Sequence, residues 1–218
     1  MVINTDLIYD KFKAVCKWCH DKFAPRRPYF LRIYFGLPGS GKSTFAASVV
    51  AKNNLIGRKT FSNVPITGAY EFSPHEDLGK FMIEDCDIII DEAGLEYNNR
   101  NFKTFTQDET YFFKYHRHYK TNLYIFSQSY DDMDKKIRAL ASELYVVKKS
   151  LLPKFIVVRR IRKKIGINDM TKDIVDEYYF DNFLLSLFFD KRIFAPLYYK
   201  YFNTYSRKEL SLKEYFQY

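Results

Sequence analysis

The stretch YFGLPGSGKST, from Tyr34 to Thr44, decides the fold class of this chain. It fills the pattern G-x-x-x-x-G-K-[S/T] with Gly36, Gly41, Lys42 and Ser43. Glycines let successive backbone N–H groups turn toward one anion, and the helix that begins at the lysine adds its positive dipole end. The pattern therefore predicts a loop that binds the phosphates of a nucleotide.

The context of this loop agrees with the prediction. Residues Tyr29 to Gly36 are rich in aromatic and β-branched types, which favour a buried strand, and Lys42 to Asn54 favour a helix. A phosphate-binding loop must follow a strand and open a helix. We expect ATP as the nucleotide, with Lys42 at its β- and γ-phosphates and Ser43 on Mg²⁺. The remaining loop residues that we expect around the nucleotide are Pro38, Gly39, Ser40 and Thr44.

Hydrolysis needs an acidic element near this loop, and the segment CDIIIDEA (Cys86–Ala93) supplies one. Its continuous apolar run is typical of a strand buried on both faces in a parallel sheet. Ligands of open α/β sheets bind at the carboxyl ends of the strands, where Asp91 and Glu92 would lie. We expect Asp91 to hold the metal with Ser43, and Glu92 to polarise the attacking water. Two solvated acids at a strand end are the alternative.

Three further residues are candidates for catalysis. Gln128 ends the apolar segment Asn122–Ser129 at the same sheet edge, where a carboxamide can contact the γ-phosphate and water. An arginine often neutralises the γ-phosphate, in cis or from a neighbouring subunit. Arg117 is the first candidate and Arg138 the second, and each can equally be a surface residue of a helix. We interpret His116 and His118 as packing or hydrogen-bonding residues.

The remaining pattern alternates strands and helices, which predicts an α/β fold with a mostly parallel central sheet, flanking helices and a C-terminal β-hairpin and helical appendage. We expect a strand over 60–66, helices over 104–120 and 131–141, and a hairpin of 143–150 with 155–164. The predicted organisation is an amphipathic helix over 1–28, an ATPase core over 29–150, and a basic, aromatic extension of the same domain over 151–218.

Composition restricts the functional classes. The chain has 218 residues, a net charge of +9 and a pI of about 9.2, which favours contact with nucleic acid or an anionic membrane surface. Three cysteines without a signal peptide indicate a reducing cytosol. Cys16, Cys19 and His20 match a haem-attachment string, but their helical spacing favours packed cysteines over a metal or haem site.

Residues 148–172 carry nine basic side chains and one acid, Asp169. This stretch has three interpretations. It can be a charged strand edge that prevents aggregation, a grip on a phosphate backbone, or a contact with anionic lipid headgroups. The sequence contains no apolar run long enough to cross a membrane.

The order and spacing of GLPGSGKST, FSNVPI, IIIDEA, YHRHYKTNLYIFSQS and MDKKIRALASELYVVKK resemble the zonular occludens toxin-like ATPases. That family includes the filamentous-phage assembly and export protein, and it is part of the hexameric DNA-pumping motors of the FtsK and HerA type. IFAPLYYKYFNTYS is similar to the aromatic segment that closes the family's ATPase domain. The resemblance spans roughly Tyr29 to Ser206.

The resemblance implies an ATP-hydrolysing motor that forms a ring, with phage single-stranded DNA or its nucleoprotein and coat or assembly proteins as partners. It implies the host cytoplasm, with peripheral contact to the inner membrane as one option. Members of the family usually carry a transmembrane helix after the ATPase domain, and this sequence shows none. Two other functions stay open, a cytosolic DNA-translocating or packaging ATPase and a nucleotide-gated adaptor with weak hydrolysis.

Overall fold

The structure is a computed structural model, and it describes residues 11, 13–16, 18, 29–93, 97, 106–131, 133–167, 174–182, 186 and 190–202. Residues 11, 13–16 and 18 are helical, as predicted, with Val15 and Trp18 exposed. The rest of the helix predicted over 1–28, including Cys19 and His20, lies outside the described residues.

The described part of the chain forms one mixed sheet with helices on both faces. Its parallel part and the helices around it are β1 (Leu31–Phe35), α2 (Lys42–Ile56), β2 (Lys59–Ser62), β3 (Tyr70–Glu71), α3 (Pro74–Asp77), β4 (Cys86–Ile90), α5 (Gln107–Tyr115), β5 (Asn122–Ser127), α6 (Lys135–Leu140) and β6 (Glu143–Lys149). The later elements are β7 (Phe155–Ile167), β8 (Ile174–Phe180), β9 (Lys191–Phe194) and the 3₁₀ helix η1 (Ala195–Tyr201).

The strand order is β3-β2-β4-β5-β1-β6-β7-β8, and β9 also pairs with β7. All pairings from β3 to β6 are parallel, so the prediction of a mostly parallel α/β sheet is confirmed. Because parallel strands share one direction, β1, β4 and β5 end at the same edge of the sheet. We call this the carboxyl edge, and the opposite one the amino edge.

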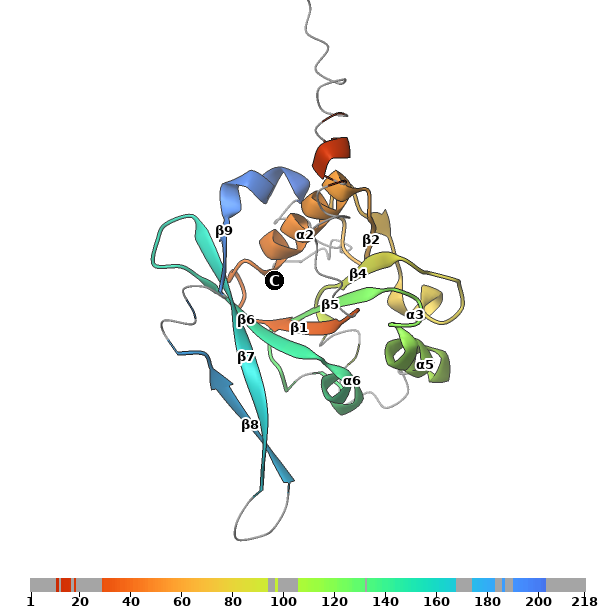
Figure 1. Cartoon of the computed structure of the whole chain (residues 1–218), viewed down its shortest axis with the longest axis vertical. Coiled ribbons are helices and arrows are strands. Elements are labelled where there is room, and N and C mark those ends of the chain that lie inside the picture. Colours follow the sequence, from red (N-terminus) through yellow and green to blue (C-terminus); the bar gives the residue numbers. More distant parts are fainter. Residues whose placement is uncertain are drawn as a thin grey trace, which may run out of the picture.

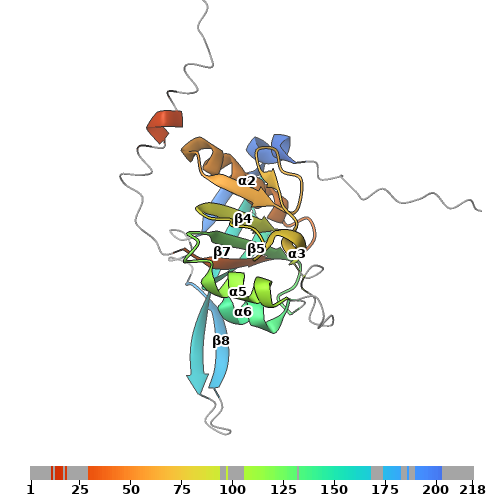
Figure 2. The same ribbon diagram turned by 90° about the vertical axis from the view of Figure 1, so that its right-hand side faces the viewer.

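Two apolar layers bury the sheet, and the strand residues alternate between them. Ile88 and Ile90 of β4 pack in the layer under α5 and α6, whereas Ile89 packs in the layer under α2. Figures 1 and 2 show α2 and η1 on one face of the sheet and α5 and α6 on the other. The continuous apolar run of β4 is therefore explained by burial on both faces, with all five of its residues buried.

The basic C-terminal segment continues the central sheet. β7 pairs with β6 in the antiparallel sense, which confirms the predicted hairpin. The other edge of β7 is shared by β9, opposite Phe155 to Val158, and by β8, opposite Ile161 to Ile167. Figure 1 shows the β7–β8 hairpin extending away from the body of the domain.

Three predicted boundaries are wrong. The helix expected over 104–120 begins only after Thr106, whose side chain and Glu109 form a capping box, and it ends at Tyr115. The helix expected over 131–141 starts at Lys135, because Asp134 caps it by accepting a hydrogen bond from the Lys136 N–H. The strand expected over 60–66 ends at Ser62.

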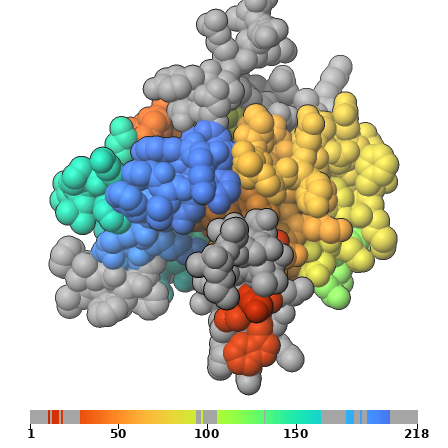
Figure 3. Space-filling model, turned by 90° about the horizontal axis from the view of Figure 1, so that it is seen from above, coloured from red at the N-terminus to blue at the C-terminus, as the bar shows by residue number. Residues whose placement is uncertain are grey.

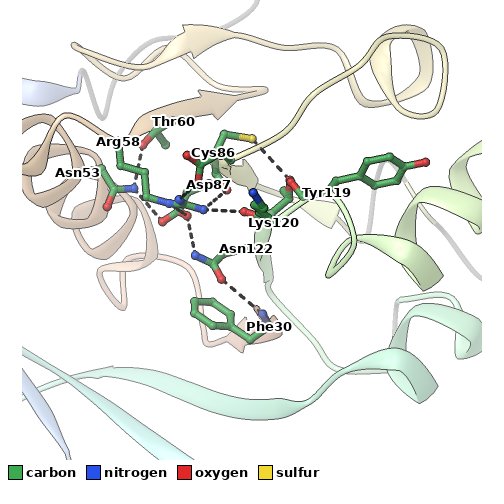
Figure 4. Close-up of polar contacts among 11 residues, drawn as sticks. Phe30, Asn53, Arg58, Thr60, Cys86, Asp87, Tyr119, Lys120 and Asn122 are labelled. Atoms are coloured by element: carbon green, nitrogen blue, oxygen red, sulfur yellow. Dashed lines mark hydrogen bonds and ion pairs between the residues drawn. The ribbon is translucent and has the colours of Figure 1, made fainter. Parts of the chain in front are cut away.

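A cluster of polar side chains links the elements at the amino edge of the sheet, and Figure 4 shows Arg58 at its centre. The Arg58 guanidinium donates to Asp87 Oδ1 at 2.7 Å and to the carbonyl oxygens of Cys86 and Lys120 at 2.7 and 2.9 Å. Asn53 and Asn122 donate to the two oxygens of Asp87 at 2.8 and 2.7 Å. The buried Asp87 carboxylate is thus satisfied by three donors, which link α2, β4 and β5.

Candidate nucleotide-binding site

The loop between β1 and α2 needs glycine at three positions. Gly39 and Gly41 have φ angles of 72° and 104°, a region that glycine adopts without a steric cost. A Cβ on Gly36 would lie 2.3 Å from the Val147 carbonyl oxygen, and a Cβ on Gly41 would lie 2.5 Å from Ile156 Cγ2. The sheet therefore holds this loop tightly from the side of β6 and β7.

The first turn of α2 is open to an anion. Gly41 is the N-cap and makes no side-chain capping bond, and the first turn carries no acidic residue. The N–H groups there and the helix dipole thus face the loop without a competing negative group. Thr44 is buried and Pro38 is exposed at the loop surface. Ser40 is buried, and its Oγ has no partner among the described residues.

Lys42 is folded over the loop. Its Nζ donates to the carbonyl oxygens of Gly36 at 2.7 Å and Leu37 at 3.3 Å. Burial lowers the pKa of Lys42, while the charges of Asp91 and Glu92 act in the opposite direction. The ammonium group therefore lies beside the loop and close to both acids that the sequence predicted for the site.

Asp91 and Ser43 meet across the carboxyl edge. Ser43 Oγ donates to Asp91 Oδ2 at 3.4 Å, and the Glu92 N–H donates to Asp91 Oδ1 at 2.9 Å. Asp91 is only 7% exposed, and burial raises the pKa of its carboxyl group. Glu92 is exposed and has a φ of 51°, a left-handed conformation that is costly for a non-glycine residue. The structure thus brings Lys42, Ser43, Asp91 and Glu92 together.

Asn63 is a site residue that the sequence reasoning missed. It follows β2, the neighbour of β4, and its side chain clamps the main chain of Asp91. The Asp91 N–H donates to Asn63 Oδ1 at 2.7 Å, and Asn63 Nδ2 donates to the Asp91 carbonyl at 3.0 Å. The sequence does contain a signal for this role, because Asn63 is a polar residue directly after the short strand in FSNVPI.

The residues fit Mg²⁺. A hydroxyl and a carboxylate oxygen are hard ligands, and Mg²⁺ commonly uses one or two carboxylates together with water and substrate phosphates. Ser43 and Asp91 supply such a pair, with the buried Asp91 carboxylate beside the Ser43 hydroxyl. No group of three His, Cys, Asp or Glu within the described residues forms another metal site, and Cys16 and Cys86 are free thiols.

The other predicted catalytic residues lie at different places. Gln128 is exposed directly after β5, at the carboxyl edge. Arg117 is exposed in the turn before β5, at the amino edge and thus across the sheet from Lys42. Arg138 lies on α6, where it pairs with Asp131 at 3.1 Å and stacks over Tyr130. A role of either arginine at a nucleotide of a second subunit stays a prediction.

The two flanking histidines differ. His116 is buried, and its Nδ1 lies 2.7 Å from the Phe113 carbonyl oxygen, so it serves to close the end of α5. Burial lowers the pKa of His116. His118 is exposed and lies against the ring of Tyr115.

The arginines of the basic stretch are held in ion pairs. Arg159 contacts Asp190 at 2.8 Å, Arg160 contacts Glu143 at 3.0 Å, and Arg162 pairs with Asp181. These pairs join β6, β7 and the segments that follow β8. In the described part of the chain, no helix is both long enough and apolar enough to span a bilayer.

The chain was compared with protein-family profiles and with curated protein sequences. The family profile described as Zonular occludens toxin (Zot) matches residues 72–173, which include Asp91, Glu92 and Gln128 and begin after the phosphate-binding loop. No curated protein sequence matches the chain.

Solved structures provide a second comparison. The N-terminal domain of zonular occludens toxin from Neisseria meningitidis is 18% identical, with a TM-score of 0.50, and the match covers 73% of this chain and 98% of that one. The genome packaging NTPase B204 from Sulfolobus turreted icosahedral virus 2 is 12% identical, with a TM-score of 0.48, and covers 69% and 97%. The sheet order and the loop between β1 and α2 show an α/β fold that is similar to that of the Neisseria meningitidis domain, and the chain is similar to the Zot family over residues 72–173.

Proposed function

We propose that this chain is a Mg²⁺-dependent ATPase that drives the assembly and export of a filamentous, inovirus-like virion. The observation that carries the ATPase part is the meeting of Lys42, Ser43, Asp91 and Glu92 at the carboxyl edge beside the open end of α2. The Zot profile over 72–173 supports the connection to phage assembly.

In this proposal, ATP replaces the internal contacts of the loop. Lys42 Nζ leaves the carbonyls of Gly36 and Leu37 for the phosphates, and the N–H groups of the loop and α2 receive the phosphate oxygens. Ser43 and Asp91 would hold Mg²⁺, which neutralises charge on the phosphates when bound. Glu92 orients a water molecule and takes a proton from it as the water oxygen bonds to the γ-phosphorus and the bond to ADP breaks.

A ring of identical subunits is part of the proposal. Arg117 lies at the amino edge, so a role for it at a nucleotide would require a second subunit whose site it completes. A hexamer acting on phage single-stranded DNA or its nucleoprotein, together with coat or assembly proteins, follows from the resemblance. A cytosolic DNA-packaging motor uses the same catalytic residues.

The test of the ATPase proposal is the exchange Glu92→Gln, with Glu84→Gln as a matched control on an exposed acid before β4. Glu92 is exposed, and its carboxamide has nearly the same shape, so ATP binding should persist. Turnover should fall by roughly 10² to 10⁴, the usual contribution of a general base. A fluorescent ATP analogue measures binding, and phosphate release measures turnover.

Three outcomes would redirect the proposal. Equal turnover of the two variants would mean that Glu92 has no catalytic role, whereas ATP binding by the wild type with turnover near background would indicate a nucleotide-gated adaptor. Stimulation of wild-type turnover that rises with the length of duplex DNA, and is absent with single-stranded DNA and coat protein, would assign the chain to packaging in the cytosol.

A further inference from the structure

The turn between β6 and β7 presents apolar side chains to solvent. We call residues 148–155 the lysine–leucine turn. Leu151 at its tip is 106% exposed relative to the reference state, and Leu152 is 61% exposed. Adjacent exposed leucines that no described part of the chain covers are unusual on a soluble surface and mark an interaction site when charge surrounds them.

Hydrogen bonds within the turn fix this exposure. The Ser150 N–H donates to the Phe155 carbonyl at 2.9 Å, and the Leu152 N–H donates to Ser150 Oγ at 3.2 Å. Pro153 restricts the chain, and Lys154 adopts a φ of 66°. The backbone therefore holds both leucines outward, where they are available to a partner.

The neighbouring segment extends the same surface. The Ala195 N–H donates to the Lys154 carbonyl at 2.9 Å, and the rings of Phe155 and Phe194 lie 5.1 Å apart. Phe194 is partly exposed beside the turn. Figure 3 shows β9 and η1, in blue, side by side with the teal β6–β7 hairpin on one face of the molecule.

The charge within the lysine–leucine turn has one sign. Lys148, Lys149 and Lys154 flank the leucines and are exposed. Neither 144–163 nor 191–202 contains an aspartate or glutamate, and the latter range adds the exposed Lys200. Asp190, which borders β9, is buried against Arg159 and does not reach this surface. The expected partner is therefore anionic and also accepts aliphatic side chains.

We propose that the lysine–leucine turn docks the protein on an anionic lipid bilayer. Leu151 and Leu152 enter the boundary between headgroups and acyl chains, while the flanking lysines keep their stems along the apolar layer and their ammonium groups at the phosphates. Each lysine near an anionic surface strengthens binding about fivefold, and the effect weakens with salt.

The chemistry of the surface favours lipid over nucleic acid. Aliphatic leucines do not stack on bases. The arginines of β7, which could make bidentate hydrogen bonds to phosphates, form ion pairs with Glu143, Asp181 and Asp190. A second copy that placed its own turn on this one would bring like charges together. Leucine flanked by lysine is the combination that interfacial binding uses.

The experiment is cosedimentation of the whole chain with vesicles of phosphatidylglycerol and phosphatidylethanolamine, compared with vesicles of phosphatidylcholine. The test variant is L151S/L152S, and F81S/M82S is its matched control, because Phe81 and Met82 are 65% and 83% exposed elsewhere on the surface. A second pair is K149E/K154E against K114E/K135E, all exposed lysines.

We expect the wild type to bind the anionic vesicles only, with L151S/L152S weaker by at least tenfold and the two control variants unchanged. Charge reversal should weaken binding by at least twentyfold, and a rise in salt should act in the same direction. Lys42→Ala should bind vesicles like the wild type, so this result does not depend on the proposed ATPase function.

Four results would overturn the proposal. Equal binding to both kinds of vesicle, or equal binding by L151S/L152S and its control, would exclude docking through this turn. Loss of single-stranded DNA binding in the turn variants without vesicle binding in the wild type would assign the surface to nucleic acid. Conversion of an oligomer to monomers by L151S/L152S, again without vesicle binding, would make the turn a subunit contact.

Discussion

The two edges of the sheet use acidic residues in opposite ways. At the amino edge, Asp87 accepts three hydrogen bonds of 2.7 to 2.8 Å from Arg58, Asn53 and Asn122. At the carboxyl edge, Asp91 is also buried, and it receives one hydrogen bond from the Glu92 N–H and a long contact of 3.4 Å from Ser43. One edge pairs its buried charge within the fold, whereas the other leaves it available for a cation.

This difference indicates that the residues at one edge serve stability and those at the other edge serve activity. A buried carboxylate with a complete set of donors stabilises the elements that it links. A buried carboxylate without them lowers the stability of the empty protein, and a bound ligand compensates for that cost. Substitutions at the amino edge should therefore act on folding, and those at the carboxyl edge on turnover.

The largest expected effect is that of Asp87→Ala. It leaves the Arg58 guanidinium buried without its main counterion, so the free energy of unfolding should fall by about 3–5 kcal/mol. Asp85→Ala removes the exposed partner of the same arginine and should cost about 1 kcal/mol or less. Urea denaturation measures both. Similar losses in the two variants would show that the amino edge does not depend on Asp87.

Lys42→Ala should act on nucleotide binding and turnover rather than on folding, in contrast to Asp87→Ala. Removal of one preorganised donor aimed at developing negative charge typically costs about 2.7–4 kcal/mol in the transition state, and we expect a similar fall of roughly 10² to 10³ in turnover here. Lys52→Ala, an exposed lysine on the same helix, is the control. The rate of phosphate release should be low for Lys42→Ala and normal for Lys52→Ala. Normal hydrolysis by Lys42→Ala would show that the loop is not part of the active site.

Asn63→Ala tests whether the clamp on Asp91 positions the acids. Two neutral hydrogen bonds are lost, and a misplaced carboxylate should lower kcat about tenfold while the KM for ATP changes little. Steady-state kinetics and a thermal melt measure the two effects. A fall in melting temperature without a change in kcat would make Asn63 a purely structural residue.

The smallest expected effect is a gain in stability. Asp91→Asn removes a buried charge, keeps an acceptor for the Glu92 N–H, and should stabilise the nucleotide-free protein by about 1 kcal/mol while turnover is lost. For a chain of this size, that corresponds to a rise of about 2–4 °C in melting temperature. A lower melting temperature would mean that Asp91 is paired more strongly than its contacts indicate.

The pH dependence of folding stability also tests whether burial of the Asp91 carboxylate is unfavourable. Burial raises the pKa of Asp91, so between its unfolded and folded values the native state holds a proton that the unfolded chain has lost. The stability of the nucleotide-free wild type should therefore rise as the pH falls through the folded value. The Asp91→Asn variant should lack this contribution, which melts at a series of pH values can show.

The site could be predicted in part from the sequence. The spacing of Gly36, Gly41 and Lys42 and the apolar run before Asp91 each have a physical requirement that can be recognised locally, and both segments were placed correctly at one edge. Asn63 could not be assigned, because its role depends on β2 lying beside β4, and strand neighbours are not encoded locally. The end of α5 at Tyr115 was missed because the sequence after it remains compatible with a helix.

By itself, the sequence determined the phosphate-binding loop, the buried parallel strands and the acids that follow β4, because short-range spacing and period specify each of them. Only the tertiary structure decided that Asp87 accepts three short hydrogen bonds and Asp91 one short and one long contact from described residues. It also decided that Arg117 lies across the sheet from Lys42, and that Leu151 and Leu152 point outward from a fixed turn. The physical reason is that pairing, edge and exposure depend on contacts between residues far apart in the chain, and these exist only when the sheet is assembled.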